Sequence, residues 1–153
     1  MADMLQMSYS EMENLSKAFS TASDELDTLN NDISNFLSDI SGKIDEWKSK
    51  STGLSGNASD TQEHLNNVKN DTRTTWQGDQ ADRFDSETYP VVYDALTKFK
   101  DQLESFSSTL ATLFSGLETT LNELSQSVTE GASNCSEDST WIADYAEQHR
   151  SIG

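Results

Sequence analysis

The sequence predicts an all-α protein, built as an elongated antiparallel helical hairpin. In two long stretches, apolar residues recur at alternating spacings of three and four, as they do in coiled coils. Between these stretches stands Gly78, which permits a tight reversal because a residue without Cβ adopts positive φ at low cost. The hydrophobic content of 33% and the single proline suit thin helical pairs, in which each helix buries one stripe, better than a compact globule or a sheet.

The first stretch predicts a helix from about residue 5 to about residue 50. Its positions between the apolar residues are mostly Ser, Thr, Asn, Asp and Glu, which have mediocre helix propensity. Packing of the apolar seam must therefore hold the helix. The seam residues are Met12, Leu15, Phe19, Ala22, Leu26, Leu29, Ile33, Phe36 and Ile40.

Residues 51–57 predict a break, because Gly53 and Gly56 together cost about 2 kcal/mol against alanine inside a helix. Ser59 and Gln62 fit a capping box, which predicts a second helix over residues 58–75. The alternative is one helix that continues through the two glycines. Either arrangement leads to a turn at residues 76–78.

After the turn, a helix is expected over residues 79–130, with Gly131 as its stop. Pro90 predicts a kink or short break near Ser86–Tyr89, since proline lacks an amide donor and clashes with the preceding turn. The seam of this helix comprises Phe99, Leu103, Phe106, Leu110, Leu113, Leu117, Leu121, Leu124 and Val128.

The hairpin domain is thus expected to cover residues 1–130, with residues 131–153 as a tail. The tail begins with the loop-like run Ser133–Ser139. A short helix over residues 140–147 would carry Trp141, Ile142 and Tyr145 at helical spacing. That helix would either dock on the bundle or stay available to a partner.

The net charge of −17 argues against nucleic-acid binding and against an anionic membrane surface. Lys and Arg are absent between Lys100 and Arg150, where acids are frequent. These acids form either a solvated surface or a docking face for a basic partner. No apolar stretch is long enough to span a membrane, and the N-terminus does not resemble a classical signal peptide.

No constellation for catalysis is apparent, so we predict no catalytic, cofactor-binding or metal-ligating residues and no enzymatic activity. His64 and His149 are far apart and neither has a partner at ligand spacing. Cys135 is expected to be a free thiol; its use as a nucleophile with His149 is a remote alternative.

A two-helix hairpin cannot cover both apolar seams by itself, so we expect association into a four-helix bundle. The partner would be a second copy or another small helical protein. In the alternative, residues 57–75 and the tail cover the seams and the protein is a monomer. The expected interface residues are Phe19, Leu26, Ile33, Phe36, Phe99, Phe106, Leu110 and Leu113.

Trp76, Gly78, Ala81 and Phe84 form the pattern Trp-x-Gly-x-x-Ala-x-x-Phe at the junction of the two seams. With this motif the chain resembles the WXG superfamily, the ESAT-like helical-hairpin proteins of type VII secretion. Leu54-Ser55-Gly56 also matches the short Leu-x-Gly element of the related LXG proteins.

The resemblance implies a role in protein–protein interaction. Its members are exported as folded dimers through a membrane-embedded machine driven by an FtsK/SpoIIIE-like ATPase, and longer relatives escort LXG toxins. It implies that Trp76 and Gly78 serve as the turn and recognition motif. It also implies a secreted or cell-surface protein that is cytoplasmic before export and uses no signal peptide.

Two features depart from the family pattern. The chain is longer than the smallest members, and the export signal Tyr-x-x-x-Asp/Glu is missing from its tail, where His149 stands at the fourth position after Tyr145. The one match, Tyr9 to Glu13, lies at the opposite end of the sequence. Escort or co-secretion with a partner therefore gains weight over independent export. The alternative function is a structural coiled-coil or scaffold protein with an incidental Trp-x-Gly turn.

Overall fold

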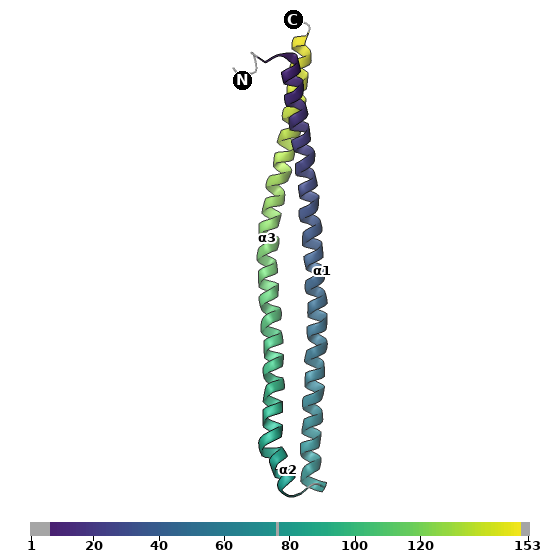
Figure 1. Ribbon diagram of the computed structural model, residues 1–153, viewed down its shortest axis with the longest axis vertical. Helices are drawn as coiled ribbons and strands as arrows, with labels where there is room; N and C mark the ends of the chain where they lie inside the picture. Colours follow the sequence, from purple (N-terminus) through teal and green to yellow (C-terminus); the bar gives the residue numbers. More distant parts are fainter. Residues whose placement is uncertain (1–6, 76, 151–153) are drawn as a thin grey trace. The chain divides into compact units, whose positions relative to one another are not determined.

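The computed structural model describes residues 7–75 and 77–150, without the side chains of 72–75. Within these ranges every residue is helical except Met7, Ser8, Gln77 and Gly78. The elements are α1 (Tyr9–Thr75), α2 (Asp79–Arg83), the π-helix η2 (Phe84–Thr88) and α3 (Tyr89–Arg150) (Figure 1). The all-α prediction is confirmed, and no strand occurs in the described ranges.

The contacts between helices divide the chain into two compact units. Unit 1 takes the residues up to Asp39 and those from Gly116 onward, and unit 2 comprises Ile40–Ser115. Both α1 and α3 contribute a segment to each unit.

Unit 2 is a helical hairpin. Its α1 segment is followed by the turn, α2 and η2, and its α3 segment then returns along α1 (Figure 1). Trp47 and Ser51 hydrogen-bond Ser107, whereas Gln62 hydrogen-bonds Thr97, so positions later in α1 meet positions earlier in α3. The two segments are therefore antiparallel, as predicted.

Unit 1 is a second antiparallel pair, in which the start of α1 lies beside the end of α3 (Figure 1). The Tyr9 hydroxyl donates to Glu147 Oε2 at 3.4 Å, and the Arg150 guanidinium lies 5.4 Å from the Tyr9 ring centre. Beneath this end a small core forms, in which Met12, Ile142 and Ala146 are buried. The half-buried residues packed on it are Met7, Leu15, Phe19 and Tyr145.

The described part of α1 begins at a capping box. The Ser8 amide donates to Glu11 Oε2 at 2.7 Å, and the Glu11 amide donates to Ser8 Oγ at 3.4 Å. Each residue thus satisfies an amide that the first turn leaves without a helical acceptor. The predicted helix start near Leu5 lies outside the described residues.

The break predicted at residues 51–57 is wrong, because α1 continues through both glycines. Ser51, Ala58 and Gln62 are all buried on this stretch. Packing there offsets the low helix propensity of Gly53 and Gly56. Ser59 and Gln62 consequently lie within the helix rather than at a helix start.

The predicted stop at Gly131 and the loop over 133–139 are also wrong, because α3 runs to Arg150. Ser139 and Ser16 exchange hydrogen bonds in both directions, each Oγ donating to the other residue's carbonyl at 2.9 Å. The serine-rich run is therefore helical and pairs with α1 through Ser139. The short helix expected over residues 140–147 is part of α3.

The irregularity expected before Pro90 takes the form of η2, the π-helix Phe84–Thr88. Proline at position 90 has no amide to donate to the carbonyl four residues earlier. The π-helix lies directly before the proline, where this bond is lost, and such single-turn π segments are one of the irregularities found within helices. The chain stays helical from Asp79 to Arg150 through this adjustment.

Candidate protein-interaction surfaces

The turn is the feature on which the sequence motif depends. Gly78 has φ 107° and ψ −176°, and it is the one positive-φ residue among the described residues. The Ala81 and Asp82 amides donate to the Gly78 carbonyl at 2.9 and 3.1 Å, which starts α2. The positive φ predicted for Gly78 is confirmed, and this conformation is essentially restricted to glycine.

The other motif residues lie on the helical side of the turn. Ala81 is buried and Phe84 is half-buried. The Phe84 ring lies 6.3 Å from that of Tyr89, edge to face. Trp76, the remaining member of the motif, lies outside the described residues.

Polar groups hold the two segments of unit 2 together. The buried Gln62 Nε2 donates to Thr97 Oγ1 at 2.8 Å and to the Tyr93 carbonyl at 3.2 Å, while its Oε1 accepts from Lys100 Nζ at 3.1 Å. Closer to the turn, the Tyr89 hydroxyl donates to Asn66 Oδ1. These contacts satisfy the polar groups that the seam buries.

Unit 1 has an equivalent polar series on α1, with members spaced seven residues apart. Ser16 pairs with Ser139, Ser23 Oγ donates to the Ala132 carbonyl at 2.9 Å, and Asn30 accepts from Ser125. This series was not recognised in the sequence, because apolar spacing was the signal used. It lies one residue after the apolar series that includes Leu15, Ala22, Leu29 and Phe36.

This one-residue offset leaves much of the apolar series uncovered. Leu29 and Phe36 are exposed on α1, and Leu117 and Leu124 are exposed on the α3 segment of the same unit. Of the interface residues predicted in unit 1, Ile33 is buried and Phe19 and Leu26 are half-buried. The predicted set therefore includes residues of the intramolecular seam as well as residues with open faces.

The α3 segment of unit 2 shows the same one-residue offset between the apolar and the polar series, and it also leaves apolar side chains exposed. Phe99, Phe106 and Leu113 are 39%, 49% and 65% exposed, whereas Leu110 is half-buried. The Phe106 ring also contacts Trp47 edge to face, with 4.9 Å between ring centres. Phe99, Phe106 and Leu113 thus form an apolar ridge spaced by seven along α3, to which Leu110 does not belong.

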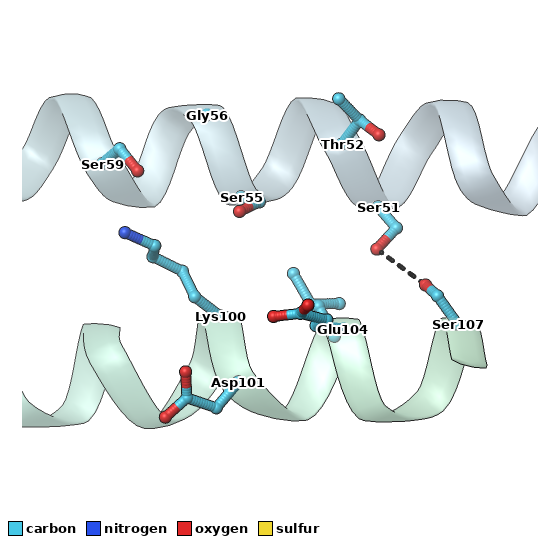
Figure 2. A pocket seen from close by; sticks show the side chains of 10 residues that line it. Ser51, Thr52, Ser55, Gly56, Ser59, Lys100, Asp101, Glu104 and Ser107 are labelled. Carbon is cyan, nitrogen blue, oxygen red and sulfur yellow. Dashed lines mark hydrogen bonds between the residues drawn. The ribbon is translucent and has the colours of Figure 1, made fainter. Parts of the chain in front are cut away.

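A cavity of about 550 Å³ lies between the two segments of unit 2. Figure 2 shows Lys100 extending from α3 toward the serines of α1, with Ser51 hydrogen-bonded to Ser107 at one end. The lining combines hydroxyls, one ammonium group and two carboxylates, and offers no nucleophile paired with a base. It comprises Ser51, Thr52, Ser55, Gly56, Ser59, Lys100, Asp101, Leu103, Glu104 and Ser107.

Charged groups lie mainly on solvent-facing positions. On the α3 segment of unit 1, exposed acids recur every seven residues at Glu123, Glu130, Glu137 and Asp144. In unit 2, a hydrogen bond from the Lys50 ammonium lowers the pKa of Glu46, which also pairs with Lys43.

Residues with catalytic or metal-binding chemistry do not converge in the described ranges. They contain no cluster of His, Cys, Asp or Glu that could hold a metal ion. Cys135 is a half-buried free thiol, and the His149 ring stacks on Tyr145 at 4.0 Å between ring centres. No described helix is long and apolar enough to cross a membrane.

Comparison with known proteins found no match: no protein-family profile matches the chain, and no curated protein or solved structure is significantly similar to it.

Proposed function

We propose that this chain is a substrate or secretion partner of a type VII secretion system and acts by protein–protein interaction through its paired helices. The observation that carries the proposal is the turn. Gly78 adopts a conformation reserved for glycine, and Ala81 is buried directly after it. These are the roles that the Trp-x-Gly-x-x-Ala-x-x-Phe pattern requires of two of its residues.

The exposed apolar ridges support the interaction role. Apolar residues spaced by seven and left open on a helical pair are typical of a surface that packs on other helices. In this proposal they join a second helical pair in a four-helix bundle, supplied by another copy, another small helical protein or an LXG toxin. In this proposal the complex then reaches the cell surface or medium through the secretion ATPase.

The second candidate is a structural coiled-coil or scaffold protein. The seven-residue repeats alone favour it, because such repeats serve many proteins that are never exported. In that case the indole of Trp76 contributes to stability and to nothing else.

Export of Trp76→Ala distinguishes the two candidates. The proposal predicts that this variant stays in the cell while its helicity and melting temperature remain close to those of the wild type. Trp141→Ala is the matched control, because it removes an exposed indole of α3 far from the turn in sequence. Normal export of Trp76→Ala, or equal retention of both variants, would refute the recognition role.

A further inference from the structure

We infer that the exposed indole of Trp141, with the carboxylates of Glu137 and Asp138 beside it, binds an arginine in a basic segment of a partner protein. This surface lies on the α3 segment of unit 1. It contains no residue of the exposed apolar ridges on which the proposed function depends. The inference therefore goes beyond that function and concerns a second, polar surface.

The indole is held in place by stacking on a neighbouring ring. Trp141 is 47% exposed, and its ring centre lies 5.6 Å from that of Tyr145, with 27° between the ring planes. Tyr145 in turn packs on the small core that contains Ile142 and Ala146. One side of the indole is thus fixed against the folded part of unit 1, while about half of its surface stays open.

Carboxylates surround the open part of the indole. On an α-helix, the surface neighbours of a residue stand three or four positions away. For Trp141 these positions hold Glu137, Asp138, Asp144 and Tyr145, and the three acids are exposed. Because Tyr145, four residues later, covers one face of the ring, the opposite face looks toward the preceding turn, which carries Glu137 and Asp138. A cation on that face would lie within reach of both carboxylates.

A guanidinium is the cation that suits this arrangement best. It is planar, so it stacks on an aromatic face while its N–H groups donate to a carboxylate. The same combination is already formed within unit 1, where the Arg150 guanidinium lies 5.4 Å from the Tyr9 ring centre and Nη1 lies 3.6 Å from Glu147 Oε1. Among the described residues, no Lys or Arg makes an ion pair or ring contact with the indole or its two neighbouring acids. An arginine at this place would therefore come from another chain.

The charge around the indole indicates that the partner segment is basic. Glu130 stands eleven residues before Trp141 and Glu123 stands eighteen before it, which is about three and five helical turns. These acids therefore lie in line with the indole along one face of α3. No Lys or Arg occurs between Lys100 and Arg150 to neutralise them. The net charge of −17 disfavours a second copy or a phosphate-bearing polymer as the occupant, whereas a segment with several basic residues is complementary.

A titration of the purified, ¹⁵N-labelled full chain tests the inference. The probe is a synthetic peptide in which arginines alternate with serines, added up to about 1 mM to detect weak binding. At about 0.15 M salt, charges more than about 8 Å apart are largely screened, which reduces general attraction. The indole N–H signal of Trp141 should shift, while that of Trp47 in unit 2 should not. The same peptide with glutamine in place of arginine should leave both signals unchanged.

Fluorescence anisotropy of the labelled arginine peptide compares variants of the site. Trp141→Leu removes the aromatic face without changing the charge, so it should raise the dissociation constant at least about three-fold, as loss of an exposed cation–π contact does. Glu137→Gln should raise it by up to about five-fold, the range of an exposed ion pair. Glu118→Gln is the matched control, because it removes the same charge from an exposed position about 140° around α3 from the indole, and it should leave the constant nearly unchanged.

Peptide binding that Trp141→Leu leaves unchanged, or that Glu137→Gln and Glu118→Gln weaken equally, would amount to general attraction to an acidic chain and would overturn the inference. A Trp141 signal that does not shift at the highest peptide concentration would also overturn it. Far-UV circular dichroism of each variant checks that the helices are retained. Trp76→Ala should bind the peptide as the wild type does, and Trp141→Leu should be exported normally, so this surface and secretion can fail separately.

Discussion

Alanine at Gly78 should destabilise the hairpin, whereas alanine at Gly53 should stabilise it. At neither position does a heavy atom lie within 4 Å of where the new Cβ would stand, so no steric clash contributes to either effect. The two sites differ in their backbone. Gly78 has φ 107° and ψ −176°, whereas Gly53 lies within the continuous helix α1.

The magnitudes follow from this difference. Forcing a residue with Cβ into the conformation of Gly78 costs about 1–3 kcal/mol of the free energy of unfolding. At Gly53, alanine should add about 1 kcal/mol, because glycine inside a helix loses more backbone entropy on folding. For a chain of this size, 1 kcal/mol corresponds to roughly 2–4 °C in melting temperature, so the two variants should differ by several degrees.

Urea and thermal unfolding followed by far-UV circular dichroism measure both effects. All variants are compared at one protein concentration, because any association makes the melting temperature depend on concentration. Gly42→Ala provides a second helical control with the same open surroundings. A stabilised Gly78→Ala would refute the role of the turn geometry, and a destabilised Gly53→Ala would refute the continuity of α1.

Two further outcomes are expected. Hydrogen bonds from the Ser8 amide and hydroxyl lower the pKa of Glu11 below 4.5. These hydrogen bonds therefore stabilise the folded state above that pH, and the stabilisation is lost as pH falls through the lowered folded-state pKa. Glu11→Gln should therefore lower the melting temperature near pH 7 and lose that difference in acid; an unchanged difference at low pH would contradict the capping role. Gln62→Ala should reduce the free energy of unfolding by about 1–3 kcal/mol because it removes a buried side chain and its three hydrogen bonds across the seam, while exposed His64→Ala should change it by less than about 0.5 kcal/mol. Equal effects of the two substitutions on urea unfolding would show that the Gln62 network contributes little.

The alternating apolar spacing was enough to predict the two helical stretches, and the turn between them was enough to predict that they run antiparallel. Gly78 was enough to predict the turn, since its positive φ is a local property of a residue without Cβ. These predictions succeeded because helix period and turn chemistry depend on neighbours in sequence.

The continuity of α1 and the helical tail could not be predicted in that way. Gly53, Gly56 and the serine-rich run 133–139 all disfavour helix by local propensity. They are helical because other residues of the same stretches pack across the seam, such as Gln62 on Thr97 and Ser139 on Ser16. A tertiary contact that depends on register leaves little trace in the local sequence.

The offset between the apolar and polar series was also missed, and it bears most directly on function. Apolar seams bind strongly but tolerate slippage, whereas matched polar pairs satisfy each other in one register. Reciprocal bonds between Ser16 and Ser139, and the three bonds of Gln62, therefore fix the alignment of α1 on α3 at a modest gain in stability. In the proposed function, apolar side chains that this offset leaves exposed, such as Phe99 and Phe106, are available for contact with another chain. If a partner covers those side chains, as proposed, much of the stability of the helical pair comes from association, and a variant such as Phe99→Asp should lower the melting temperature as well as the affinity.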